Sequence, residues 1–313
     1  MQSDALAIGI DFGGTSVKFG VIRGAEVIDQ APPIATQDFD GPAPLLDAMV
    51  RYIEDLRARH AGIAAVGVGM PGFVDFEQGV VRNLTNVAGW QEFPLKARLS
   101  ERTGLPVVVD NDANCMAYAE WKLGAGRGLQ HLIAITLGTG VGGGLVVNNR
   151  MVRGARFGAG EVGQMSLDWK GLRGTYGNFG ALEEYIGNQQ ITQAATEAYH
   201  AAGTHRSPDD LTPAALSRAA HQGDATALAI WKTVAEQLAN VLMDCCWLLN
   251  PEALIIGGGV AKAGPLLFDP LRESLHAQLS APFKEALQLL PAHFGNEAGM
   301  IGAAAQALEA GSK

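Results

Sequence analysis

"LAIGIDFGGTSVKFGVI" (residues 6–22) and "HLIAITLGTGVGGGLVVN" (residues 131–148) share one pattern, in which a glycine turn separates two apolar runs. Short apolar runs on either side of paired glycines predict two strands joined by a tight turn. Because this hairpin with a glycine-rich tip occurs twice in one chain, we expect two similar halves that face each other. The two stretches therefore decide the fold.

The segments around the two hairpins alternate between strand and helix. We expect buried strands at 63–72 and 105–112, the second running directly into a helix, and a further strand near 26–30. A strand, a glycine loop and the start of a helix are expected over 252–264. Apolar residues at helical spacing or alanine-rich composition predict helices at 42–60, 181–201, 212–221, 224–249 and 297–311. This order indicates an α/β protein with a mixed sheet in each half.

The composition is that of a soluble globular protein. The chain has 313 residues, 48 % hydrophobic and 18 % charged, which is enough for two domains sharing a cleft. A formal net charge of -9 argues against a nucleic-acid partner. No apolar stretch is long enough to cross a bilayer, and the three cysteines fit neither a disulfide framework nor a zinc spacing. We therefore expect a cytoplasmic protein without a membrane partner. Cys115 is either a reactive thiol or a packed side chain.

Three glycine loops each follow an apolar strand: Gly13-Gly14, 138–144 and 257–259. Together they suggest a nucleotide held from two sides of a cleft by backbone amides, although any one of them could be a simple hairpin turn. The middle loop also fits G-x-G-x-x-G, but "GLVVN" follows it as a strand where a dinucleotide-binding fold needs a helix. No Walker A sequence is present. Asp11 is placed to reach a Mg²⁺ ion through water.

Acidic residues supply candidates for the chemistry. Asp112 and Asn111 stand where a strand passes into a helix, at the edge where open α/β sheets bind ligands. Asp112 could take a hydroxyl proton during phosphoryl transfer while Asn111 binds a neighbouring hydroxyl; the alternative is a helix cap. Glu161 and Glu183 could accept hydrogen bonds from sugar hydroxyls, or they could be solvated surface acids.

These motifs, taken together, resemble those of a known family. "IGIDFGGTSVKFGV", "VDNDANCMAYAE", "LGTGVGGGLV", "GEVGQ", "ALEEY" and "LIIGGGVA" stand in the order and spacing of the ROK family of sugar kinases, within the actin-like ATPase superfamily. The match runs from Ile8 to the closing "GMIGAAAQAL". The resemblance implies a two-domain actin-like (ribonuclease H-like) α/β fold with a mixed sheet in each domain. It divides the chain into 1–112 plus 298–313 and 113–297, with ATP and sugar in the cleft between them.

The resemblance also implies roles for single residues. By position, Asp112 resembles the catalytic base of the family. The implied sugar contacts are Gly72, Asn86, Asn111, Asp112, Glu161, Gln164 and Glu183. The implied phosphate and nucleotide contacts are Asp11, Gly13, Gly14, Thr15, Lys18, Gly138, Thr139, Gly140, Gly258 and Gly259. ATP and Mg²⁺ are the implied cofactors. Many members of the family are dimers, which implies a homodimer.

One stretch, residues 160–187, departs from the family pattern. The resemblance places a zinc site there, held by one His and three Cys, but this chain has other residues at the four positions: Gln164, Gly174, Tyr176 and Ala181. A site that has lost all four ligands will not bind zinc, so we expect none. Three aromatic residues of the stretch could fill the vacated volume by packing, or could lie exposed: Trp169, Tyr176 and Phe179.

The function that best fits these features is ATP-dependent phosphorylation of a hexose, with the 6-hydroxyl of glucose as the first choice of acceptor. Fructose, mannose and N-acetylated hexosamines are alternatives, because Gln164 differs from the histidine of the family. A sensor that binds sugar or nucleotide without catalysis is a second alternative. Polyphosphate as donor is less favoured, because no Lys/Arg cluster offers a basic approach surface.

Overall fold

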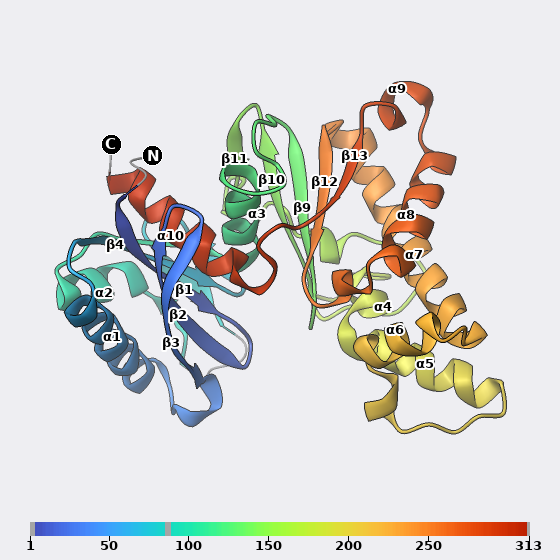
Figure 1. Cartoon of the computed structure of the whole chain (residues 1–313), viewed down its shortest axis with the longest axis horizontal. Helices are drawn as coiled ribbons and strands as arrows, with labels where there is room; N and C mark the ends of the chain where they lie inside the picture. The colour runs from blue at the N-terminus through green and yellow to red at the C-terminus, as the bar shows by residue number, and fades with distance from the viewer. Residues whose placement is uncertain (1–3, 85–88, 312–313) are drawn as a thin grey trace.

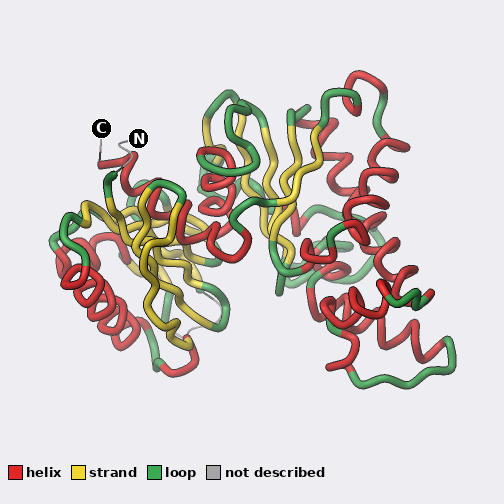
Figure 2. Tube along the Cα trace, in the orientation of Figure 1, coloured by secondary structure: helices red, strands yellow, loops and turns green. Residues whose placement is uncertain are grey.

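The computed structural model describes residues 4–84 and 89–311, and in it two five-stranded sheets repeat one topology. The first sheet contains β1 (Leu6–Phe12), β2 (Ser16–Arg23), β3 (Glu26–Ala35), β4 (Ile63–Met70) and β8 (Val107–Asn111), in the order β3-β2-β1-β4-β8. The second contains β9 (Leu132–Leu137), β10 (Val141–Val147), β11 (Arg150–Val152), β12 (Ala253–Gly257) and β13 (Gln288–Pro291), in the order β11-β10-β9-β12-β13. In each sheet the first three strands of this order are antiparallel and the last two run parallel to the third. Figure 2 shows the strands of both sheets in yellow. The predicted repeat and the mixed α/β class are confirmed.

Helices cover both faces of each sheet (Figure 1). The first sheet packs α1 (Pro42–Arg59) and α2 (Leu95–Thr103) on its outer face. Between the sheets lie α3 (Asp112–Lys122), against β9 and β10, and α10 (Ala298–Gly311), against β1 and β4. On the far side of the second sheet lie α4 (Glu183–Ile186), α5 (Asn188–Ala201), α6 (Pro213–His221), α7 (Ala225–Leu249), α8 (Pro265–Gln278) and α9 (Ala281–Lys284). Short 3₁₀ turns occupy Thr36–Asp38, Val162–Gln164, Pro208–Leu211, Val260–Ala263 and Gly295–Glu297.

The C-terminal helix α10 returns to the first sheet because glycines let it approach the strand backbones. A Cβ atom on Gly9 of β1 would lie 2.1 Å from the carbonyl oxygen of Met300. A Cβ atom on Gly67 of β4 would lie 1.9 Å from that of Ala303. Any side chain at these positions would push the helix off the sheet. The chain therefore crosses back from the second sheet and ends on the first.

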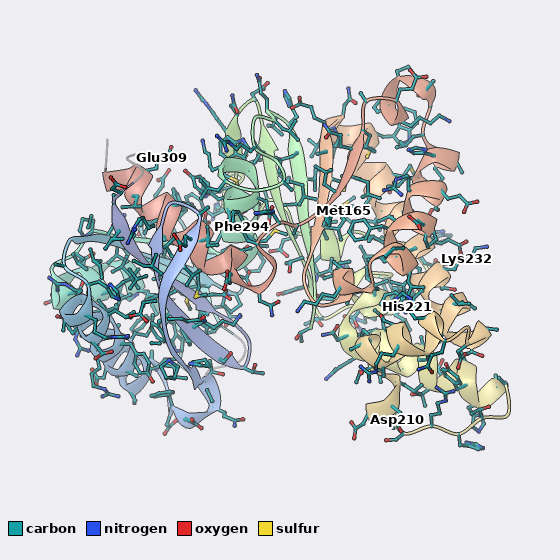
Figure 3. The ribbon with its side chains drawn as sticks, in the orientation of Figure 1. Met165, Asp210, His221, Lys232, Phe294 and Glu309 are labelled. Carbon is teal, nitrogen blue, oxygen red and sulfur yellow. The ribbon has the colours of Figure 1, made fainter. Side chains whose placement is uncertain are left out.

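Two acidic side chains hold α10 against α3. The carboxylate of Glu120, buried at the end of α3, accepts backbone N–H bonds from His293 and Phe294 at 2.8 and 2.9 Å. Phe294 precedes α10 and Glu309 lies near its other end (Figure 3). The Glu309 carboxylate accepts a hydrogen bond from the Tyr118 hydroxyl of α3. The C-terminal half of α3 thus contacts both the segment before α10 and the far end of α10.

The structure differs from the sequence prediction in several places. The helix expected over 181–201 is broken at Gly187 into α4 and α5, and the strand expected at 26–30 extends to Ala35. A small sheet of β5 (Phe73–Asp75), β6 (Val80–Asn83) and β7 (Gln91–Phe93) was not predicted, nor was β13. These strands are only three or four residues long, so their apolar pattern is too short to stand out.

The glycine loop expected over 138–144 is also shorter than predicted. Only Gly138–Gly140 form the turn, where the Gly138 N–H donates to the Gly140 carbonyl at 2.9 Å, and β10 begins at Val141. Gly144 lies in β10, outside the turn, and contacts α3. A Cβ at this position would lie 2.4 Å from the Cβ of Ala117 in α3. The later glycines of this run let a strand and a helix pack closely.

Candidate active site

A cavity of about 460 Å³ opens between the two sheets and gathers most of the predicted site residues. The predicted residues that line it are Gly14, Gly72, Asn111, Asp112, Gly138, Thr139, Gly140, Glu161, Gln164 and Glu183. Predicted residues outside its lining are Asp11, Gly13, Thr15, Lys18, Gly258 and Gly259. Asn86 lies outside the residues that the structure describes. The cavity joins the tips of both hairpins to the start of α3.

Asp112 has the most perturbed carboxyl in this cavity. It is the first residue of α3, and its Oδ1 accepts the N–H of Ala113 at 2.8 Å. Burial raises its pKa from 3.8 to about 7, and the charges of Asp11 and Glu161 add to the rise. A carboxyl with a pKa near neutrality can accept a proton from a bound hydroxyl and release it afterwards. Asp112 is therefore suited to general base catalysis.

Asn111 is the N-cap of α3, as the alternative interpretation proposed. Its Oδ1 accepts the N–H groups of Ala113 and Asn114 at 2.9 and 3.2 Å. Its Nδ2 donates to the Gly72 carbonyl at 3.1 Å. Gly72 has a φ of 79°, and a Cβ there would lie 2.7 Å from the Asn83 carbonyl, so glycine is required. One hydrogen of the Asn111 amide is left for a ligand in the cavity.

The carboxylate of Glu183 links Gln164 to the second hairpin tip. Its Oε2 accepts the N–H of Val141 at 2.8 Å, and its Oε1 lies 3.4 Å from Nε2 of Gln164. The pKa of Glu161 is raised by burial and by the charge of Glu183. Glu183 is half-buried and hydrogen-bonded, whereas Glu161 lines the cavity with an exposed side chain.

Gln164 lines the cavity and has one polar atom without a partner. Within the described part of the chain its Oε1 is buried and has no hydrogen-bond partner. A buried acceptor without a partner costs free energy.

The first hairpin tip lies opposite the second. The Gly13 N–H donates to the Ser16 carbonyl at 2.8 Å, which closes the turn between β1 and β2. At the end of β1, Oδ2 of Asp11 pairs with Nζ of Lys18 at 3.1 Å. A Cβ atom on Gly299 would lie 2.7 Å from Oδ1 of Asp11, so only glycine leaves that oxygen open.

The third glycine loop, residues 257–259, follows directly on β12. A Cβ atom on Gly258 would lie 2.2 Å from the carbonyl oxygen of Leu137, and its φ is 87°. Glycine is required at 258 because the loop passes directly over the end of β9. The second and third loops therefore lie side by side.

Sequence reasoning missed Arg153, which joins the two sheets beside the cavity. Its guanidinium pairs with the buried Oδ2 of Asp110 at 2.7 Å, stacks on the Phe76 ring at 3.6 Å and donates to Gln306 at 2.8 Å. Asp110 is 2 % exposed and stands two residues before Asp112. No local pattern marks Arg153, because its partners come from distant parts of the chain.

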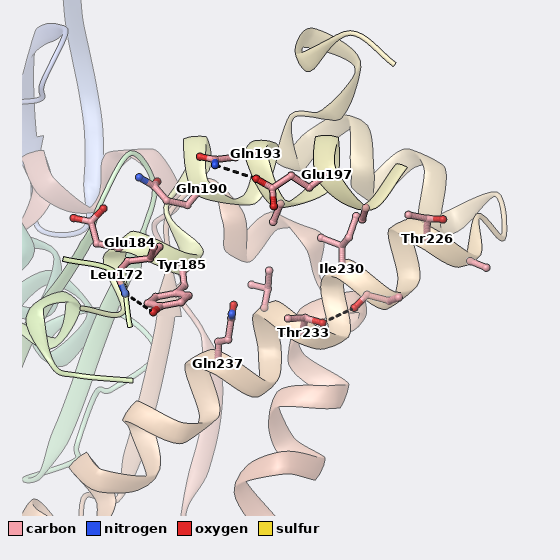
Figure 4. Close-up of a pocket in the computed structure, with 15 residues that line it drawn as sticks. Leu172, Glu184, Tyr185, Gln190, Gln193, Glu197, Thr226, Ile230, Thr233 and Gln237 are labelled. Atoms are coloured by element: carbon pink, nitrogen blue, oxygen red, sulfur yellow. Dashed lines mark hydrogen bonds between the residues drawn. The ribbon is translucent and has the colours of Figure 1, made fainter. Parts of the chain in front are cut away.

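The stretch that departs from the family pattern is held by hydrogen bonds. Backbone bonds from Leu167 to Gly180 and from Gly180 to Leu172 measure 2.7 and 2.6 Å. The Leu172 N–H donates to the Tyr185 hydroxyl at 3.1 Å, beside the groove between α5 and α7 (Figure 4). Asn178 donates to the carbonyl of Gln164 at 2.8 Å. Among the residues that the structure describes, no group of three or more His, Cys, Asp or Glu side chains could hold a metal ion.

Aromatic packing does not fill the space of the four ligands, so that expectation is wrong. Trp169 is 75 % exposed, Tyr176 62 % and Phe179 52 %. Gly174 and Ala181 occupy two of the ligand positions, and a Cβ on Gly174 would lie 3.2 Å from the Cβ of Ala181. The backbone has closed the space itself, so no volume is left for rings.

Cys115 is a packed side chain. It is fully buried in α3, and burial together with the charges of Asp110 and Asp112 raises the pKa of its thiol well above the usual value. A thiol in that environment stays protonated and unreactive.

The described residues also include no helix long and apolar enough to span a bilayer.

A cavity between two repeated sheets, walled by two hairpin tips and a half-buried acid, defines a phosphotransferase of the actin-like ATPase class. The ROK family model matches residues 7–310, and the chain belongs to this family. The glucokinase of Halalkalibacterium halodurans is 34 % identical over 96 % of this chain and 94 % of its own length. That of Streptomyces coelicolor is 34 % identical over 97 % of this chain and 98 % of its own.

A solved structure agrees with this assignment. A ROK family glucokinase from Streptomyces griseus, in complex with glucose and AMPPNP, superposes with a TM-score of 0.84 at 33 % identity. The match covers 97 % of this chain and all of that one. The two-domain actin-like fold expected from the sequence is confirmed.

Proposed function

We propose that the chain is an ATP-dependent hexose kinase that phosphorylates glucose at the 6-hydroxyl. One observation carries the proposal: Asp112, a half-buried acid with a pKa of about 7, lines the same cavity as Gly14 and Gly138–Gly140 of the two hairpin tips. The relatives named above are glucokinases. We divide the chain into a domain of 1–112 plus 298–313 and a domain of 113–297, because α10 packs on β1 and β4.

In the reaction, the hydroxyl oxygen of the sugar attacks the γ-phosphorus of ATP. The hydroxyl proton passes to the carboxylate of Asp112, and the bond between the γ-phosphorus and the bridging oxygen breaks to release ADP. The amides of the hairpin tips stabilise the charge that develops on the phosphoryl oxygens. The ionised form of Asp112 is required, so its pKa of about 7 sets the pH at which the reaction becomes fast.

The sugar binds through the amide and carboxyl groups on the cavity wall. The buried Oε1 of Gln164 accepts one hydroxyl, and the carboxylates of Glu161 and Glu183 accept others. Asn111 donates its free amide hydrogen, while Gly72 holds the turn beside it. Asn86 is proposed as a further sugar contact because of its position in the sequence.

The nucleotide binds across the two hairpin tips, through Gly13, Gly14 and Thr15 of the first. Gly138–Gly140 of the second tip also contact it. Gly258 and Gly259, in the third glycine loop, lie beside the adenosine. Mg²⁺ fits Asp11, whose Oδ1 is left open by Gly299 and whose Oδ2 pairs with Lys18. When bound, the ion neutralises charge on the phosphates.

We further propose that the enzyme needs no zinc. The loop between Met165 and Leu182 is closed by its own backbone, and its ends are paired by a hydrogen bond of 3.0 Å from Leu182 N to the Met165 carbonyl. A homodimer in the cytoplasm, without nucleic acid or a membrane as partner, is part of the same proposal and rests on the family.

The test is ADP release with MgATP across glucose, fructose, mannose and N-acetylated hexosamines, using protein prepared with chelator. The proposal expects sugar-dependent ADP release with glucose as the best acceptor. Binding of ATP and sugar without any ADP release would refute it and leave a sensor. Preference for another hexose would keep the kinase and change its substrate.

A further inference from the structure

The cavity has an aromatic edge that the reaction described above does not use. Tyr176 lines the cavity together with Glu161 and Gln164. Its ring packs edge-to-face on Phe73, with the ring centroids 6.3 Å apart and the planes at 68°. Phe73 begins β5, close to the first sheet, whereas Tyr176 belongs to the loop that follows the second. The pair therefore joins the two halves of the chain at one wall of the cavity.

Phe73 contacts both halves of the chain. It follows Gly72, whose carbonyl accepts the Asn111 amide at 3.1 Å, so its backbone is tied to the residue before Asp112. A Cβ on Gly158 would lie 3.1 Å from the Phe73 ring, so a glycine of the opposite domain gives the ring its space. The ring is 36 % exposed and packs on Tyr176.

Tyr176 presents an exposed ring at the cavity wall. The side chain is 62 % exposed, although it is a large aromatic group at the wall of a pocket. Burial, and then the charges of Glu161 and Glu183, raise the pKa of its hydroxyl. Trp169 and Phe179, also exposed, do not line the cavity.

We propose that Tyr176 is a specificity-determining residue of the sugar site, with its ring against the C–H face of the bound hexose and its hydroxyl on a sugar hydroxyl. A pyranose presents an apolar face and a polar rim, and a tyrosine offers the matching rigid surface and polar tip. Phe73 positions the Tyr176 ring. The inference rests on the proposed function, because it assigns a further residue to the sugar site of that kinase.

The test compares Tyr176→Ala, Tyr176→Phe and Phe73→Ala, with Phe179→Ala as the matched control from the same loop. Tyr176→Ala is expected to raise KM for the sugar about tenfold and to leave KM for ATP and kcat within about threefold, because stacking contributes to ground-state binding. Tyr176→Phe is expected to restore most of the affinity, and Phe73→Ala to give a smaller rise. Phe179→Ala is expected to match the natural chain.

Two results would overturn the inference. One is an unchanged KM for the sugar in Tyr176→Ala. The other is a rise in KM for both substrates together with a lowered melting temperature, since that would indicate a structural role. Calorimetric titration of the sugar in the absence of ATP separates the two proposals. If the natural chain binds sugar without turnover, the kinase proposal fails, and weaker binding by Tyr176→Ala still supports the stacking role.

Discussion

Replacing Asp112 by asparagine is expected to make the fold more stable while it abolishes turnover. The carboxyl of Asp112 has a pKa of about 7 in the folded chain, against 3.8 for an ordinary aspartate, chiefly because it is buried. Each unit of difference is worth about 1.4 kcal/mol, so ionised Asp112 destabilises the fold by about 4 kcal/mol. Asparagine keeps the acceptor for the Ala113 N–H and carries no charge.

The pH dependence of this effect has a defined sign. Stability from protonated Asp112 is fully present below pH 4 and is lost as the pH rises to about 7. The free energy of unfolding in urea should therefore rise by up to about 4 kcal/mol in Asp112→Asn at pH 8, and by about 2 kcal/mol less at pH 5.5.

Asp110→Asn is the control, because this neighbouring acid is buried but paired with Arg153 at 2.7 Å. The free energy of unfolding of Asp110→Asn should be lower than that of the natural chain by about 1–3 kcal/mol at both pH values. Equal or lower stability of Asp112→Asn at pH 8, or a gain independent of pH, would refute the assignment of a destabilised buried base.

Three further predictions follow from other contacts. The kcat/KM of the natural chain should fall about tenfold per pH unit below pH 7, because the ionised Asp112 is required; a flat profile from pH 5.5 to 8 would contradict this. Gly67→Ala should lower the free energy of unfolding by at least about 2 kcal/mol, because its Cβ would lie 1.9 Å from the Ala303 carbonyl, and an unchanged urea midpoint would argue against this packing. Chelator treatment followed by Mg²⁺ should restore full activity, and a requirement for added Zn²⁺ would show that the loop binds metal after all.

Local patterns were sufficient to predict the framework of the fold. Both hairpins are marked by apolar runs around glycine pairs, and their recurrence predicted two sheets of the same kind. A strand over 105–112 that runs directly into a helix was also predicted, because an apolar run ends at polar capping residues; the boundary lies between Asn111 and Asp112. The placement of Asp112 at the edge of the sheet follows from those two elements.

Features that depend on distant partners were not predictable. Arg153 stands in an ordinary turn sequence, and only the folded chain places it against Asp110. Tyr176 was singled out as a replaced ligand whose ring would either pack inward or lie exposed, and the ring lies exposed at the cavity wall. The break at Gly187 also has a tertiary cause, since a Cβ there would lie 2.9 Å from the Thr139 carbonyl of the second hairpin tip.

The central claim is that Asp112 serves the chemistry and is not needed to bind the sugar. Its most direct test measures glucose affinity by calorimetry and sugar-dependent ADP release for the natural chain and for Asp112→Asn. We predict that the variant binds glucose within about threefold of the natural chain while ADP release falls at least about a hundredfold. Turnover within about tenfold of the natural chain, in a variant that still binds glucose, would contradict the assignment of Asp112 as the base.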